Sequence, residues 1–150
     1  MMRMPLIRGL IRRRILVNFR VDPEVMQRHL PARFEPKLLC DSAVAGICLI
    51  RLEQIRPSFV PAPLGLWSEN AAHRVAVRWV DDEGQPQEGV YIPRRDSDSL
   101  VNHLIGGRLF PGEHHPARFT VRETADQIEL SMRSDDGGAR VQLQIGRAHV

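Results

Sequence analysis

The stretch Leu66–Val80, with the sequence LWSENAAHRVAVRWV, decides the fold. Side chains of a strand alternate between two faces, so every second residue shares a face. One of the two faces is apolar apart from two residues, and it consists of Trp67, Glu69, Ala71, His73, Val75, Val77 and Trp79. This pattern predicts one long strand whose apolar face points inward. It also places a carboxylate and an imidazole on a buried face.

Further strands are expected on both sides of this segment. Asp81 to Gly84 (DDEG) is a hairpin turn signal directly after it, and a second turn signal, DDGG, occupies residues 135–138. Many hairpin-linked strands indicate a mainly β fold, either an antiparallel barrel or a strongly curved sheet. We expect the further strands at residues 14–20, 43–55, 87–92, 117–123, 127–133 and 139–144.

Two short helices are predicted between the strands. Asp22 can cap a helix whose first position is Pro23, and Pro31 ends that helix. The second is expected to begin at Ser97 or Asp98, where a side chain can cap it. It should run to about residue 106, where two glycines follow each other.

Composition fits one globular domain. The chain has 150 residues, of which 43% are hydrophobic and 26% charged. No apolar run reaches about 18 residues, so no membrane span is expected. Arginines interrupt the apolar N-terminal residues, which argues against a signal peptide, and Cys40 and Cys48 form no CxxC pair. We therefore expect a cytoplasmic protein with reduced thiols.

Charge does not indicate a nucleic-acid partner. The net charge is +3, and Lys37 is the only lysine among 21 basic residues. Arginines alternate with acidic residues over most of the chain, so no basic stripe dominates. At the C-terminus, residues 145–150 (IGRAHV) match one reading frame of a common sequencing adapter. We expect one incomplete domain over residues 1–144, and we give His149 no function.

Two polar residues on the inward face are candidates for a site. A buried carboxylate such as Glu69 must be paired or hydrogen-bonded, or its pKa rises, and such groups mark functional sites. The alternative is that Glu69 meets an arginine at the rim of the barrel, and the residues alone leave both interpretations open. For His73, the pattern favours a core or rim histidine with its hydrogen bonds satisfied.

The arginines of residues 12–14 provide a cation that could pair with Glu69 or hold a ligand carboxylate. For any one of them, a solvated position at the start of a strand is the ordinary alternative. Strand parity places Arg13 on the face of Ile15 and Val17, and Arg12 on the opposite face. A bulge would reverse this assignment.

The glycine- and proline-rich stretch 106–116 predicts a shaped loop. Glu113, His114 and His115 are residue types that bind metals, but adjacent residues of a strand point to opposite faces. No HxxxH motif or matching cysteine accompanies them. We therefore expect neither a metal site nor a cofactor.

The chain resembles the acetoacetate decarboxylase-like superfamily, and within it the uncharacterised YqjF-like branch. The resemblance covers about residues 10 to 123 and depends on the order of its motifs. The motifs are FRVDPE at residues 19–24, LP at 30–31, LWSE at 66–69, GVY at 89–91, GR at 107–108 and FP at 110–111. It implies the antiparallel β-barrel of that superfamily, truncated at its C-terminal end.

The resemblance also carries over site residues by position. It implies that Glu69 matches the active-site glutamate of the decarboxylases and that Arg12 matches their active-site arginine. The decarboxylases have two lysines after the aromatic-Pro pair, where this chain has Gly112 and Glu113. Arginine cannot replace the Schiff-base lysine, because it stays protonated. Lys37 lies beside a proline in an expected loop, so Schiff-base chemistry is not predicted.

The sequence thus predicts a protein that binds a small organic molecule, with a carboxylate as one option, in a barrel pocket around Glu69. One alternative is an enzyme of the lyase or isomerase type that uses Glu69 as general acid or base on a keto acid. Another is an interaction module that pairs through an exposed strand edge, and a homo-oligomer fits this option. The expected pocket residues besides Glu69 are Arg12, Arg13, Trp67, His73, Phe110 and His114.

Overall fold

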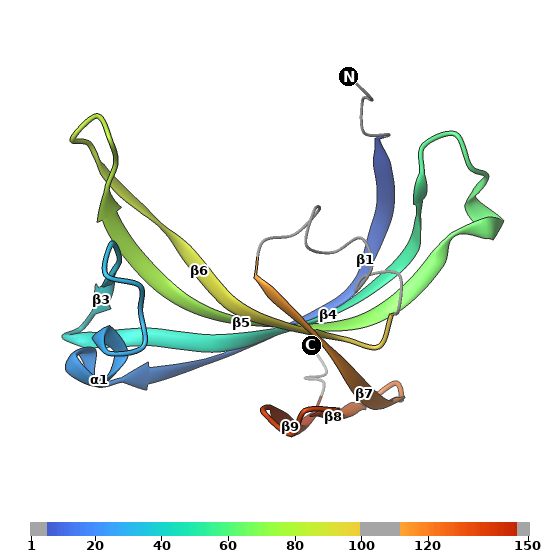
Figure 1. Ribbon diagram of the computed structural model, residues 1–150. Coiled ribbons are helices and arrows are strands. Elements are labelled where there is room, and N and C mark those ends of the chain that lie inside the picture. The colour runs from blue at the N-terminus through green and yellow to red at the C-terminus, as the bar shows by residue number, and fades with distance from the viewer. Residues whose placement is uncertain (1–5, 100–111, 147–150) are drawn as a thin grey trace.

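The computed structural model describes residues 6–99 and 112–146, and its strands form one strongly curved sheet (Figure 1). The main path of the sheet runs in the order β1-β4-β5-β6-β7-β8-β9. These strands are β1 (Ile7–Val21), β4 (Ser42–Pro57), β5 (Leu66–Val80), β6 (Pro86–Ser97), β7 (Glu113–Glu123), β8 (Gln127–Ser134) and β9 (Arg140–Gly146). Two short strands lie off this path, β2 (Glu35–Pro36) beside β5 and β3 (Leu38–Leu39) beside β4.

The prediction of a mainly β fold is confirmed, and the described strands form an open half-barrel. Strands β1, β4, β5 and β6 form a trough that bends upward at both ends, and β8 and β9 lie beneath its middle (Figure 1). Neighbouring strands of the main path are antiparallel except β6 and β7, which pair in parallel. The parallel pair follows from the chain leaving β6 and returning beside it in the same direction.

Local signals placed most elements correctly. The predicted strand 66–80 is β5 with the same bounds, and α1 (Pro23–Gln27) begins where Asp22 was expected to cap it. The Asp22 carboxylate accepts the backbone N–H groups of Glu24 and Val25 at 2.9 and 3.0 Å. A 3-10 turn, η1 (Ala62–Leu64), occupies the proline-rich loop. Of the helix predicted up to residue 106, residues 100–106 lie outside the described residues.

Strand β1 is longer than the sequence predicted. It starts at Ile7 rather than at residue 14, and it pairs with β4 from Ile7 opposite Pro57 to Val21 opposite Ala43. The arginines that interrupt its apolar pattern were expected to lie before the strand. They fit within it because many residues of this segment are exposed, so no apolar alternation is required there. None of the helices among the described residues is long and apolar enough to cross a bilayer.

The main core lies between the trough and the strands beneath it. Leu49 and Ala71 of the trough are 0% and 1% exposed, and Leu130 and Met132 of β8 are 2% and 1% exposed. A second, smaller core lies where α1 covers one end of β5. Its buried members are Met26, Leu30, Ala43, Val75 and Val77. The two cores share the predicted inward face of β5.

The alternation along β5 is confirmed with two exceptions. Glu69, Ala71 and Val77 are buried as expected, but Trp67 is 61% exposed. Trp67 lies at the start of β5, near one end of the trough. Ser68 was expected on the outer face, yet it is 0% exposed. Strand β5 has neighbours on both sides in the sheet, and its middle is covered on both faces.

Leu49→Ala should lower the free energy of unfolding by about 2–5 kcal/mol, because it removes a fully buried side chain and leaves a cavity. Leu39→Ala is the matched control, since Leu39 is 65% exposed, and its effect should stay within about 0.5 kcal/mol. Urea denaturation followed by circular dichroism measures both. Equal effects of the two substitutions would contradict the described core.

Candidate functional site

Glu69 lies at the centre of a buried ionic cluster. It is on β5, directly opposite Arg51 of β4, which in turn lies opposite Arg13 of β1. Arg13 Nη2 donates to Glu69 Oε2 at 2.5 Å, and Arg51 Nη1 donates to Glu69 Oε1 at 3.4 Å. The side chains of Arg13 and Glu69 are only 7% and 5% exposed. Both carboxylate oxygens therefore receive a guanidinium donor.

A bulge in β1 lies directly before Arg13, the arginine that is buried. The pairing with β4 shifts between Ile11 and Arg13, and Arg12 is left without a partner position. Arg12 is exposed, whereas Arg13 shares the buried face with Ile15, as strand parity predicted. The resemblance had matched Arg12 to the active-site arginine, and the structure places Arg13 beside Glu69 instead. Regular alternation from Ile15 to Arg13 explains this, because the bulge lies before Arg13 and does not reverse its face.

The outer part of this cluster reaches the surface. Arg51 Nε donates to Glu53 at 2.8 Å, and its guanidinium lies 5.3 Å from the ring centroid of Trp67. Hydrogen bonding to Glu53, with the charge of Glu69, raises the pKa of Arg51. Arg13 Nη1 donates to Glu123 of β7 at 3.4 Å. We call Arg13, Arg51, Glu53, Glu69 and Glu123 the Glu69 cluster.

One donor of the Glu69 cluster has no acceptor among the residues that the structure describes. The Nε atom of Arg13 is buried and has no hydrogen-bond partner among the described residues. A buried donor without a partner costs about 1–3 kcal/mol. Glu69 thus forms the ion pair with an arginine that was one of the two interpretations of the sequence. Because both of its oxygens accept from guanidinium groups, Glu69 is not a free carboxylate.

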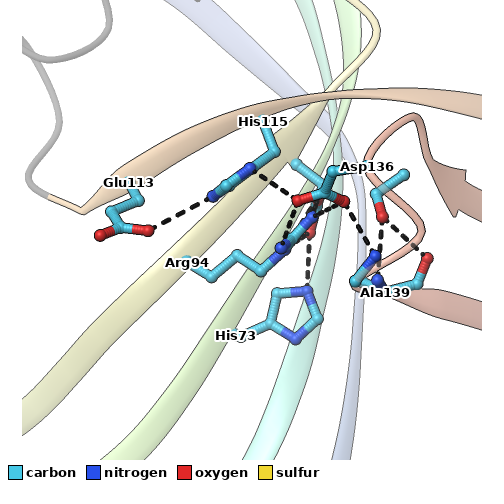
Figure 2. A network of polar contacts seen from close by, with 9 residues as sticks. His73, Arg94, Glu113, His115, Asp136 and Ala139 are labelled. Carbon is cyan, nitrogen blue, oxygen red and sulfur yellow. Dashed lines mark hydrogen bonds and ion pairs between the residues drawn. The ribbon is translucent and has the colours of Figure 1, made fainter.

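A second polar network joins β5, β6, β7 and the turn before β9 (Figure 2). Its buried centre is Asp96 of β6, which is 0% exposed. Arg94 donates to Asp96 through Nε at 3.0 Å and through Nη2 at 2.7 Å, and His73 Nε2 lies 2.8 Å from Asp96 Oδ2. Burial raises the pKa of Asp96, but the hydrogen bonds from His73 and Arg94 outweigh burial and lower it. Asp96 is thus held as a carboxylate.

Asp136 extends this network to the turn between β8 and β9. It accepts from Arg94 Nη2 at 2.8 Å, and its other oxygen lies 3.0 Å from His115 Nδ1. The hydrogen bond from Arg94, with others from Ser134 and the Gly138 backbone, holds the pKa of Asp136 well below its usual range. A Cβ atom at Gly138 would lie 2.7 Å from Arg94 Nη1, so this glycine permits the contact. We call His73, Arg94, Asp96, His115 and Asp136 the Asp96 network.

A cavity of about 200 Å³ lies on the other face of the central strands. Alternation turns Asn70 and Ala72 to this face, opposite to Glu69, and the bulge at Arg12 turns Ile11 toward it. We call it the concave-face cavity. Its aliphatic wall is made by Ile11, Ile50 and Leu52, and its polar wall includes Asn70, Arg95, Ser97 and His114. Burial lowers the pKa of the Arg95 guanidinium.

The two histidines at the start of β7 separate as the sequence predicted. His114 lies opposite Arg95 in the parallel pair and lines the concave-face cavity, whereas His115 lies opposite Asp96 and reaches Asp136. Within residues 6–99 and 112–146, no group of three or more His, Cys, Asp or Glu side chains is arranged to hold a metal ion.

The predicted site residues therefore divide among three places. Glu69, Arg13 and Trp67 lie in or beside the Glu69 cluster, His73 lies in the Asp96 network, and His114 lines the concave-face cavity. Phe110 lies outside the described residues. Sequence reasoning missed Arg51, Arg95 and Asp96. A correct strand register would have found them, because each lies opposite a β5 residue.

The described strands have the fold of acetoacetate decarboxylase-like proteins. Residues 10–149 match the family DUF2071, whose description is "Uncharacterized conserved protein (COG2071)". This match covers most of the chain, so the chain belongs to the DUF2071 family. A comparison with curated proteins finds no match.

Solved structures of acetoacetate decarboxylase-like proteins share the fold. Acetoacetate decarboxylase from Legionella pneumophila subsp. pneumophila str. Philadelphia 1 aligns with a TM-score of 0.63 at 16% identity, over 98% of this chain and 52% of that chain. An acetoacetate decarboxylase-like enzyme from Sphingomonas wittichii RW1 aligns at 0.60 and 17% identity, over 88% and 54%.

A third similar structure is the enduracididine biosynthesis enzyme MppR in complex with pyruvate. It aligns with a TM-score of 0.56 at 18% identity, over 89% of this chain and 54% of that chain. This chain therefore spans about half the length of these proteins. At such identities the similarity shows the fold alone.

Glu69→Gln should lower the free energy of unfolding by about 3–5 kcal/mol, because it leaves the buried charge of Arg13 without its main partner. Glu35→Gln is the matched control, since Glu35 pairs with Arg78 on the surface and should contribute at most about 1 kcal/mol. Chemical denaturation measures both.

Replacing both Arg13 and Glu69 tests whether the loss of stability comes from an unpaired buried charge. Arg13→Met combined with Glu69→Leu should recover most of the stability lost in Glu69→Gln, because neither buried charge remains. A double variant as unstable as the single one would contradict the ionic origin of the loss.

Asp136→Asn should make stability less dependent on pH in the acid range. The folded-state pKa of Asp136 is lowered, so its stabilising contribution is present above the unfolded value of about 3.9 and is lost as pH falls toward the folded pKa. Asp96 acts in the same direction, whereas burial raises the pKa of Asp98, which acts in the opposite one.

The measurement is urea denaturation of both proteins from pH 7 down to pH 3. The difference in unfolding free energy between wild type and Asp136→Asn should be largest near neutral pH and should shrink below about pH 4. A difference that stays constant over this range would contradict the lowered pKa.

Proposed function

We propose that this protein binds a small organic molecule bearing a carboxylate in the concave-face cavity. The observation that carries this proposal is the division of the cavity into an aliphatic wall and a polar wall that holds Arg95 and His114. Ligand sites commonly combine a mainly apolar surface with a few polar groups that orient the ligand. An aliphatic chain would contact Ile11, Ile50 and Leu52, with its carboxylate at the other end.

The size of the cavity limits the ligand. A dry cavity of about 150 Å³ binds benzene in other proteins, and the concave-face cavity has about 200 Å³. It therefore accommodates a molecule slightly larger than benzene. Short-chain organic acids and small keto acids fall within this limit, whereas nucleotides do not.

Arg95 supplies the recognition of the anion. A guanidinium carries five donors in a planar fork that matches the two oxygens of a carboxylate, so it can serve a ligand in addition to a protein partner. Burial lowers the pKa of Arg95, which means that the protein has removed water from its charge. A ligand carboxylate would be a further acceptor for this guanidinium. Ser97 and His114 on the same wall add further hydrogen-bonding groups.

The similar structures support a ligand of this kind. MppR holds pyruvate, which is a small keto acid, on the same fold. In this chain the ligand would be bound without a Schiff base, because Lys37 is the only lysine. Lys37 is 48% exposed and pairs with Glu88 on the surface, away from the residues that line the cavity. The proposed pocket is the concave-face cavity, which lies on the face of β5 opposite to Glu69.

Isothermal titration with pyruvate, acetoacetate, butyrate and hexanoate tests the proposal. At least one of these acids should bind, and Arg95→Met should weaken its binding about 10- to 100-fold, which corresponds to losing a charge-assisted hydrogen bond. Ile50→Phe should also weaken binding, because the larger side chain fills part of the cavity beside the aliphatic wall. Arg118→Met is the matched control, because the side chain of Arg118 is 88% exposed.

Three results would contradict the proposal. They are binding of none of the four acids, equal binding by Arg95→Met and wild type, and an equal loss in Arg118→Met. Circular dichroism of each variant shows whether it is folded. If Arg95→Met is unfolded, Ile50→Phe decides the question.

A further inference from the structure

We propose that His73 and Asp96 form a proton-transfer pair that serves a second site, a groove between β1, β4 and β9. This groove has a volume of about 440 Å³ and lies on the face of Glu69, so it is separate from the concave-face cavity. We call it the β9 groove. Its lining includes His73, apolar side chains of Val17, Phe19 and Leu143, and the cation Arg140. This inference does not rest on the proposed function.

The geometry fixes the tautomer of the neutral His73 imidazole. Asp96 is fully buried, and its lowered pKa keeps it as a carboxylate that can only accept hydrogen bonds. His73 Nε2, which lies 2.8 Å from Asp96 Oδ2, must then carry a hydrogen atom. The neutral imidazole consequently has its lone pair on Nδ1. In serine proteases a buried aspartate also orients a histidine base, although there it holds Nδ1–H and Nε2 is the base.

The second ring nitrogen faces the groove rather than the network. Figure 2 shows that this nitrogen of His73 points away from Arg94 and Asp136. Nδ1 has no hydrogen bond to any other residue that the structure describes, and the side chain is 28% exposed. A base therefore lines a groove with its lone pair available to a bound molecule.

Arg94 and Asp136 keep the pair in place. Arg94 contributes two nitrogen atoms to Asp96 and also binds Asp136, which in turn contacts His115. Asp96 therefore cannot rotate away from His73 without breaking several charge-assisted bonds. Asp96 is a positioning residue, and His73 is the group that would touch the substrate.

The lining of the groove indicates the class of substrate. Arg140 can bind a carboxylate, and the apolar residues suit a short carbon chain. A base acting alone can remove a proton from a carbon atom next to a carbonyl group. In this step the C–H bond breaks, Nδ1 takes the proton, and the electron pair moves into an enolate whose charge rests on the carbonyl oxygen. The imidazolium formed is stabilised by Asp96, and the proton then returns to carbon from the ring or from solvent.

Proton exchange in heavy water tests this inference without any added cofactor. Pyruvate and 2-oxobutyrate in D₂O near neutral pH should lose the proton signal next to the carbonyl faster with the protein than with an equal concentration of free imidazole. His73→Gln should reduce the protein-dependent rate about 100-fold or more. The glutamine amide can still donate to Asp96, so the network remains paired.

Two further variants separate catalysis from structure. Leu143→Trp fills the groove and leaves the pair intact, so it should also abolish exchange. His29→Gln is the matched control, because His29 is exposed and lies outside the Asp96 network, and its rate should equal that of wild type. Long-range ¹H–¹⁵N NMR should show His73 with hydrogen on Nε2 at neutral pH.

Three outcomes would overturn the inference. The first is exchange by wild type no faster than by imidazole. The second is an unchanged rate in His73→Gln or in Leu143→Trp. The third is a spectrum that places the hydrogen of neutral His73 on Nδ1. If His73→Gln does not fold, Leu143→Trp and the NMR spectrum still decide the question.

Discussion

Arg13 of β1 and Glu69 of β5 form an ion pair at 2.5 Å, and their side chains are only 7% and 5% exposed. A buried charge is tolerated only when another charge or several hydrogen bonds compensate it. Asp96 obeys the same constraint through Arg94 and His73. The partners of these buried charges come from other strands, as Arg13 of β1 does for Glu69 of β5, or from the same strand, as Arg94 does for Asp96.

Two further ion pairs of these clusters link the trough to β7 and to the turn before β9. Glu123, the last residue of β7, binds Arg13, while Asp136 in the turn before β9 binds Arg94. The apolar core between the trough and β8 supplies most of the contact area but is not directional. The ionic contacts are directional, so they set where β7 to β9 lie. The β9 groove therefore owes its shape to residues of the Asp96 network.

The sequence was sufficient for features that depend on local pattern. The bounds of β5, the cap at Asp22 and the burial of Glu69 follow from alternation and capping chemistry, which involve only nearby residues. The bulge at Arg12, which turns Ile11 to the other face, and the roles of Arg51 and Arg95 depended on strand pairing. Both are set by pairing between distant segments, so no single segment contains the information.

The fold is kept although Lys37 is the only lysine of the chain. The strands keep the acetoacetate decarboxylase-like arrangement, yet the positions that the resemblance matches to lysines hold Gly112 and Glu113. Glu69, with both of its oxygens bound by guanidinium groups, is then a structural anion rather than a partner of an amine. The partly exposed groups of the two polar clusters include the His73 imidazole and the Arg51 guanidinium, besides the carboxylates of Glu123 and Asp136. Anion binding and proton transfer, which we propose for this protein, require a fixed geometry but no covalent intermediate.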